Sequence, residues 1–172
     1  MANPHNKWLH KYIISILIPS LQEMGFEWRK QGTAKEVGRE IVLGLPFGEM
    51  RRRRGDVVDI VQISLRKRDR SFFKIHAGSC PIEGAREYLR GRHVQLNEMK
   101  VDYLEKSWTL KPNPRSFRFF GFRFKWLRNL TQADYERLVR RVAGYVPEIE
   151  DALLSGKAGP HMHFVHIEPQ YK

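Results

Sequence analysis

Three histidines near the end of the chain have the residue type and spacing of a metal site. His161, His163 and His166 lie within six residues. Imidazoles two residues apart on a strand share one face and can bind one metal ion. His166 would point to the opposite face of an unbroken strand. Because no neighbouring Cys or His completes a standard ligand set, the sequence favours a structural or surface role, and we predict neither a metal nor a cofactor.

Two carboxylates stand in an otherwise basic stretch. Paired carboxylates such as Asp56 and Asp59 can hold Mg²⁺ in a nuclease, with Glu40 and Lys74 as further candidate groups. In the simpler interpretation Asp56 fills the turn after Gly55, and Asp59 pairs with an arginine on a neighbouring strand. We favour the simpler interpretation, since nothing in the spacing requires a metal.

His76 and Cys80 are the remaining candidates for chemistry. His76 could act as a general base or contact a phosphate, but a half-exposed histidine in a sheet is the interpretation that we favour. Cys80 is the only cysteine, so the chain forms no internal disulfide, which fits a reducing, cytoplasmic compartment. Walker, G-x-S-x-G, H-E-x-x-H and C-x-x-C motifs are absent from the sequence. We therefore predict no catalytic residue.

The positive charge of the chain is large and clustered. The 172 residues carry a net charge of +12, and the segments 51–70 and 115–128 each contribute +5. Clustered basic residues predict a polyanionic partner, either nucleic acid or an acidic protein, and the alternative is a solvated surface. The predicted contact residues are Arg51, Arg52, Arg53, Arg54, Arg66, Lys67, Arg68, Arg70, Arg118, Arg123 and Lys125.

Two apolar runs predict the centre of a sheet. The run 57–65 is rich in β-branched residues that alternate between two faces, and the run 72–77 alternates in the same way. The charged segment 66–70 between them suits a hairpin turn. Further strands are predicted at 26–29, 40–45, 47–54, around 101–104, around 107–110, at 117–126 and at 162–167.

Helices are predicted at both ends of the chain. Apolar residues at three- and four-residue spacing predict a helix over 6–24, with a kink or break at Pro19. A second helix begins at Thr131, where Asp134 completes a capping box, and a further helical segment covers 148–154. A short helix is also predicted over 82–90.

The order of these elements predicts an α+β fold, an antiparallel sheet with an N-terminal and a C-terminal helix packed on one face. The length is typical of one domain spanning 1–172. Since no apolar run approaches the roughly 20 residues of a spanning helix, we expect no membrane insertion.

The first 80 residues resemble the domain of unknown function 4304 family. Three groups of residues carry the resemblance: the helix end Leu21, Gly25 and Phe26, then 52–58 with Ile60 and Val61, and the aromatic strand Phe72, Phe73, Ile75 and Gly78. The resemblance implies a compact α+β domain of mainly bacterial origin. It implies no reaction and no catalytic residues.

The sequence leaves three functions open. The first is a non-catalytic module that binds nucleic acid or another polyanion by arginine–phosphate contacts. The second is a protein-interaction module that neutralises an acidic partner such as a toxin or effector. A metal-dependent hydrolase using Asp56, Asp59 or the terminal histidines is a minor third.

Overall fold

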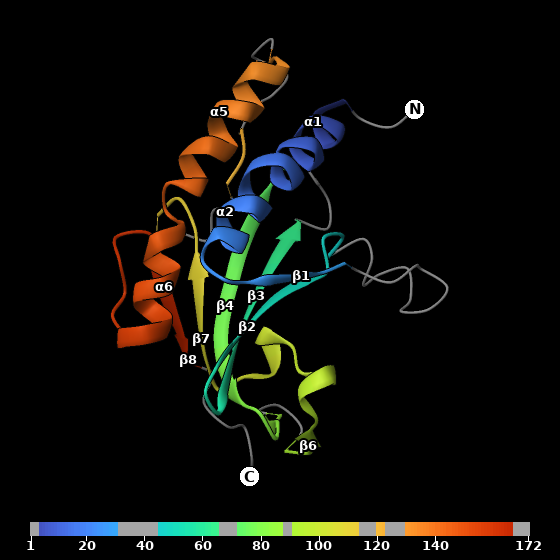
Figure 1. The fold of residues 1–172 in the computed structure, drawn as a ribbon. Helices are drawn as coiled ribbons and strands as arrows, with labels where there is room; N and C mark the ends of the chain where they lie inside the picture. The colour runs from blue at the N-terminus through green and yellow to red at the C-terminus, as the bar shows by residue number, and fades with distance from the viewer. Residues whose placement is uncertain are drawn as a thin grey trace.

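The chain folds into an antiparallel sheet of six strands, with its main helices on one face (Figure 1). The computed structural model describes residues 4–30, 45–65, 72–87, 91–113, 120–122 and 130–166. The strand order is β1-β2-β3-β4-β7-β8. The strands are β1 (Glu27–Arg29), β2 (Glu49–Arg54), β3 (Val57–Leu65), β4 (Phe73–Pro81), β7 (Lys106–Leu110) and β8 (Met162–His166). The predicted α+β class is confirmed.

The hairpin of β3 and β4 is the centre of the sheet, as predicted. Its register runs from Val57 opposite Pro81 to Leu65 opposite Phe73. β4 extends beyond the predicted end at Ala77, because small residues continue the pairing. A Cβ at Gly78 would meet Cδ1 of Leu104, so a larger residue here would displace the end of that side chain.

The N-terminal helical segment changes its hydrogen-bond register before its proline. It comprises α1 (Pro4–Tyr12), the π-helical turn η1 (Ile13–Leu17) and α2 (Ile18–Glu23). Pro19 has no N–H to donate to the preceding turn, and π-turns accommodate such interruptions. The chain therefore remains helical through Pro19, with the disturbance placed one turn earlier.

The C-terminal helices are α5 (Gln132–Ala143) and α6 (Val146–Ser155). The predicted capping box is present: the backbone N–H of Thr131 donates to Asp134 Oδ2 over 2.8 Å. α6 ends at Gly156, whose φ of 68° is left-handed. Buried apolar residues of both helical segments and of β2, β3 and β4 form one core on this helix face of the sheet.

The opposite, outer face of the sheet is covered by a smaller layer. It holds the two-stranded ribbon of β5 (Ala85–Arg86) and β6 (His93–Val94) and the 3-10 turns η2 (Leu96–Glu98) and η3 (Val101–Tyr103). A second apolar cluster packs this layer against Val58, Ile60 and Cys80.

Two predictions fail in this outer layer. The helix over 82–90 is wrong for its described part, where Gly84 turns the chain with a φ of 91° into β5. The strand around 101–104 is also wrong, because the chain forms η3 there. In both places apolar residues without clear periodicity are buried by tertiary packing, so local pattern does not decide the structure.

Several predictions fall outside the described residues. These are the strand at 40–45, the turn at 66–70 and most of the strand at 117–126. Within that last segment Phe120 forms a bridge with Phe73, and both Phe120 and Phe122 contact the core. Among the described residues, no helix is long and apolar enough to cross a membrane.

Candidate functional site

The arginine run of β2 is divided between the two faces of the sheet. Successive strand residues point in opposite directions, and Met50 lies in the core on the helix face. Arg52 and Arg54 therefore point to the helix face, whereas Arg51 and Arg53 point to the outer face. Four consecutive arginines thus do not form one binding surface.

Arg52 and Arg54 converge on the carboxylate of Asp59. Asp59 is fully buried and lies opposite Arg52 across the strand pair. Its Oδ2 accepts from Arg52 Nη2 over 3.0 Å and from Arg54 Nε over 2.6 Å, and its Oδ1 accepts from the hydroxyl of Ser79 over 2.6 Å. Arg52 also donates to Glu150 of α6 over 2.6 Å. The predicted cross-strand pairing of Asp59 is confirmed.

This network keeps Asp59 ionised. Burial alone raises the pKa of its carboxyl, but the hydrogen bonds from Arg54, Ser79 and Arg52 outweigh burial and leave the pKa below its usual value. Asp56 is exposed in the turn after Gly55, as predicted. The described residues contain no group of three or more His, Cys, Asp or Glu side chains that could hold a metal ion.

Arg51 holds the outer layer against the sheet. The residue is 4% exposed. Its guanidinium donates to the carbonyl of Leu96 over 2.5 Å and to that of Met99 over 3.1 Å, and it pairs with Glu49 over 2.7 Å. A guanidinium with these internal partners is part of the fold rather than of an open surface.

Arg53 is the exposed member of the run. It lines a hollow of about 330 Å³ on the outer face, together with Arg29 of β1, which is also exposed. The acidic residue Glu27 lines the same hollow. The remaining predicted contact residues lie outside the described residues; they are Arg66, Lys67, Arg68, Arg70, Arg118, Arg123 and Lys125.

The described residues that bound these basic segments meet at one end of the sheet. Leu65, which precedes segment 66–71, is paired with Phe73. Phe73 is bridged to Phe120, which follows segment 114–119 and stands close in sequence to segment 123–129. Leu110 pairs with Ile75 near the same end, which is the upper end of β4 in Figure 1. The described residues Leu65, Phe73 and Phe120, which stand beside these basic segments in the sequence, therefore lie together at one end of the sheet.

His76 belongs to a polar group on the outer face of β4. Its Nε2 lies 3.0 Å from Ser64 Oγ, and its Nδ1 lies 3.2 Å from Thr109 Oγ1. Burial, with a contribution from nearby Lys74, lowers the pKa of His76 to about 3. The imidazole is therefore neutral at neutral pH and is held by two hydroxyls. His76 is partly exposed on its strand, which fits the half-exposed sheet histidine that we favoured.

The C-terminal histidines do not act together. His161 Nδ1 lies 2.6 Å from Glu148 Oε1, and its ring stacks on Tyr145. His163 lies opposite Thr109 on the outer face, and His166 pairs with Glu105 at 4.0 Å on the helix face. The spacing predicts one shared face for His161 and His163, but β8 begins only at Met162, so His161 is turned toward α6 instead.

Cys80 is buried in β4, and burial raises the pKa of its thiol. A thiol with a raised pKa is poorly suited to nucleophilic chemistry at neutral pH.

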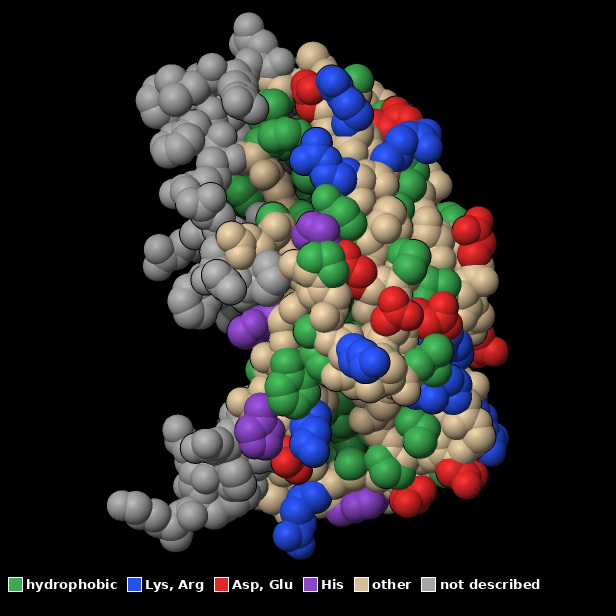
Figure 2. Space-filling model, turned by 90° about the vertical axis from the view of Figure 1, so that its left-hand side faces the viewer, with side chains coloured by type: hydrophobic (Ala, Val, Ile, Leu, Met, Phe, Trp, Pro, Cys, Tyr) green, Lys and Arg blue, Asp and Glu red, His purple; other side chains and the backbone are tan. Residues whose placement is uncertain are grey.

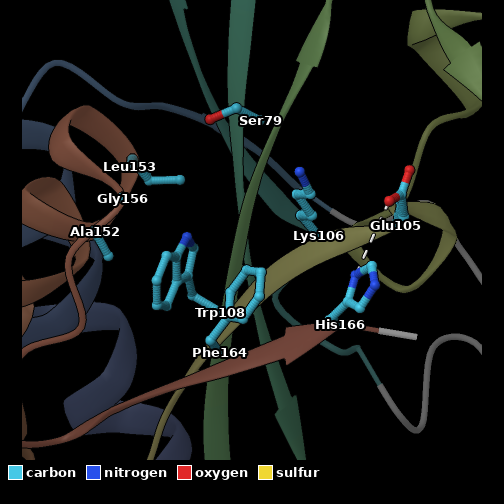
Figure 3. A pocket seen from close by; sticks show the side chains of 9 residues that line it. All are labelled: Ser79, Glu105, Lys106, Trp108, Ala152, Leu153, Gly156, Phe164 and His166. Atoms are coloured by element: carbon cyan, nitrogen blue, oxygen red, sulfur yellow. Dashed lines mark ion pairs between the residues drawn. The ribbon is translucent and has the colours of Figure 1, made fainter. Parts of the chain in front are cut away.

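A larger hollow, of about 620 Å³, lies between α6 and the strands β7 and β8 (Figure 3). Trp108 and Phe164 lie at its centre, with Lys106 and His166 beside them. Sequence reasoning missed this site because single aromatic residues in short strands usually belong to a core. The only signal was the spacing of two residues between Lys106 and Trp108 in β7 and between Phe164 and His166 in β8.

No family model matches the chain, and no curated protein or solved structure shows significant similarity to it. The resemblance to the domain of unknown function 4304 family thus stays a prediction.

Proposed function

We propose that this chain is a non-catalytic module that binds nucleic acid or another polyanion. The contacts come from the basic segments 66–71, 114–119 and 123–129, whose described neighbours in the sequence lie where β3 ends and β4 begins. The observation that carries the proposal is the meeting of their bounding residues, Leu65, Phe73 and Phe120, at that end. The segments 66–71, 114–119 and 123–129 together contain nine Lys or Arg and a single Asp.

The charge of the described surface supports this assignment by contrast. On the side of the molecule where α5 and α6 lie, basic and acidic side chains are intermixed (Figure 2). Arg137 and Arg140 of α5, for example, pair with Asp134 and Glu136. A mixed surface attracts a polyanion weakly, whereas a local excess of arginine releases counterions on contact with phosphates.

The proposal assigns different roles to the predicted contact residues. Arg51, Arg52 and Arg54 have internal partners and support the fold. Arg53 is exposed and is available as an additional contact. Binding is therefore expected to depend mainly on Arg66, Lys67, Arg68, Arg70, Arg118, Arg123 and Lys125.

The test compares two variants that each remove three positive charges. R66A/R68A/R70A removes them from the proposed surface, and R137A/R140A/R141A removes them from α5. Each nuclease-treated protein is titrated against labelled single-stranded RNA and duplex DNA at several salt concentrations. We expect R66A/R68A/R70A to weaken binding. The salt slope, which is the slope of the logarithm of the binding constant against the logarithm of the salt concentration, should fall in magnitude by about 0.7–0.9 for each lost phosphate contact.

The α5 variant is expected to keep the salt slope of the wild type. Equal losses in both variants would contradict the assigned surface, because net charge alone would then explain binding. Absence of binding at low salt would contradict the polyanion function itself and leave the protein-interaction module as the better hypothesis. Unfolding curves of both variants control for stability.

A further inference from the structure

The hollow between α6, β7 and β8 presents aromatic rings on an accessible surface. The cross-strand register places Trp108 opposite Phe164 and Lys106 opposite His166. Because side chains two residues apart share a face, an aromatic pair and a polar pair stand side by side. Figure 3 shows these four side chains along the two strands, with α6 on the far side of the hollow.

The rings form a short ladder. The centroids of Trp108 and Phe164 are 4.8 Å apart, and the rings of Phe164 and His166 are parallel within 2° at 6.3 Å. Phe164 is 41% exposed, which is unusual for a large apolar side chain at the centre of a strand. An exposed ring beside a second ring offers a stacking surface to a planar ligand.

The opposite wall of the hollow is apolar and firmly held. It is formed by Ala152, Leu153 and Gly156 at the end of α6. The carbonyl of Leu153 accepts from Arg54, and the hydroxyl of Ser79, at the upper rim in Figure 3, donates to Asp59. The arginine network thus ties this wall to β3 and β4, and β4 pairs with β7, which carries Trp108. The hollow is therefore largely formed before a ligand arrives.

The rim of the hollow carries three polar groups of different kinds. Lys106 is a donor, the Glu105 carboxylate is an acceptor, and the His166 imidazole can be either. Lys106 and Glu105 are both exposed, and Glu105 pairs with His166 at 4.0 Å. The charges of Lys106 and Glu105 offset each other, so the rim favours a neutral ring that presents both carbonyl and N–H groups at its edge.

We propose that this hollow binds a nucleobase, which stacks on Phe164 and Trp108 and hydrogen-bonds at its edge to Lys106 and Glu105. A nucleobase is planar, aromatic and neutral, and carries donors and acceptors at its edge, whereas a phenylalanine side chain would leave the rim unused. A volume of about 620 Å³ is within the range of small-molecule sites. The inference goes beyond the proposed polyanion binding and does not require it.

The first experiment uses a free nucleotide. Adenosine 5′-monophosphate is titrated into the full chain, with ribose 5-phosphate, which has the phosphate but no base, as the matched ligand. The readout is the indole N–H resonance of Trp108, assigned with W108F. We expect saturable shifts with the nucleotide only. The proposal would be overturned if both ligands shifted the resonance equally. It would also be overturned if neither ligand shifted it and the protein showed no preference for an RNA strand with bases over an abasic strand.

The second experiment tests whether a base in a strand occupies the hollow. A 12-nucleotide single-stranded RNA is compared with an abasic strand of the same length and charge. We expect the strand with bases to bind more tightly, by about tenfold for one stacked base. If the free nucleotide binds and the two strands bind equally, the ligand is a free nucleotide. If the RNA strand binds more tightly than the abasic strand and the free nucleotide does not bind, the ligand is an unpaired base.

Variants connect these signals to the hollow. F164A removes the exposed ring, and K106A removes the donor without changing the packing. Both are expected to weaken nucleotide binding, F164A by about tenfold. The control is L154A, which removes an exposed apolar side chain that lies in α6 and outside the hollow, and it should have no effect. Unchanged binding in F164A and K106A would overturn the proposal.

Failure of this inference is distinguishable from failure of the proposed function. R66A/R68A/R70A should weaken binding of the abasic strand and leave binding of the free nucleotide unchanged. F164A should weaken binding of the free nucleotide and leave binding of the abasic strand unchanged.

Discussion

Asp59 is the centre of a hydrogen-bond network that joins α6 to the sheet. Its carboxylate accepts hydrogen bonds from two arginines and a serine, and Arg52 extends the network to Glu150 of α6. Removing either the buried carboxylate or one of its partners leaves a charged or polar group without a hydrogen bond, which lowers the free energy of unfolding.

We predict that D59N destabilises the fold by about 3 kcal/mol or more, because two partly buried arginines lose their anion. The matched control is D56N, which changes an exposed carboxylate three residues earlier and should alter stability by no more than about 0.5 kcal/mol. Urea unfolding followed by circular dichroism measures both. Equal midpoints for D59N and the wild type would show that the network does not stabilise the fold.

His76 predicts how stability depends on pH. Its pKa is lowered to about 3 in the folded chain, against about 6.5 when unfolded. Between these values the unfolded chain binds a proton that the folded chain does not. The contribution of His76 is therefore fully present above about pH 6.5, and it declines as the pH falls toward 3.

We predict that the unfolding free energy of the wild type falls between pH 7 and pH 5 by about 2 kcal/mol more than that of H76Q. Glutamine keeps a hydrogen-bonding side chain but does not titrate, so the variant lacks this part of the slope. Unfolding curves at several pH values give the comparison. Parallel pH profiles for the two proteins would show that His76 titrates normally in the folded chain.

At the scale of elements, the sequence predicted the secondary structure correctly wherever the hydrophobic periodicity and the capping or turn residues favoured the same element. The hairpin of β3 and β4 and the capping box at Thr131 were both predicted, because local chemistry and tertiary packing favour the same structure there. It was insufficient over 82–104, where short ribbons and turns are defined by the surface that they cover. No periodic pattern encodes that surface, so an incorrect helix and an incorrect strand were predicted.

Two left-handed glycines offer a matched test of that outer layer. Gly156 has a φ of 68° and open space around its Cα, whereas Gly84 has a φ of 91° and lies directly against the backbone of Val94. We predict that G156A costs about 1 kcal/mol through backbone strain alone, and that G84A costs more, because β5 must also separate from β6. Thermal unfolding measures both; an equal loss would show that the ribbon yields without cost.

For the whole molecule, the candidate sites were only partly predictable. Composition identified the basic segments, but it could not show that a strand directs consecutive arginines to opposite faces. Three members of the run 51–54 consequently support the fold rather than a surface. The hollow at Trp108 and Phe164 was not predicted, because it requires α6, β7 and β8 to be brought together.

This division of roles predicts how the arginine run responds to substitution. R51A removes the donor to the carbonyls of Leu96 and Met99, and it should destabilise the fold by about 3 kcal/mol. Hydrogen exchange should accelerate first in the outer layer over 82–104. R53A removes an exposed side chain and should leave stability within about 0.5 kcal/mol of the wild type, while it weakens polyanion binding modestly.

Denaturant unfolding, hydrogen exchange and RNA titration of the two single variants separate folding from binding. Replacing all four arginines at once would unfold the chain, so a loss of binding in that variant would say nothing about the surface. If R51A were as stable as the wild type and lost binding, the buried guanidinium would have to become exposed to its ligand. The assignment of Arg51 to the fold would then be wrong.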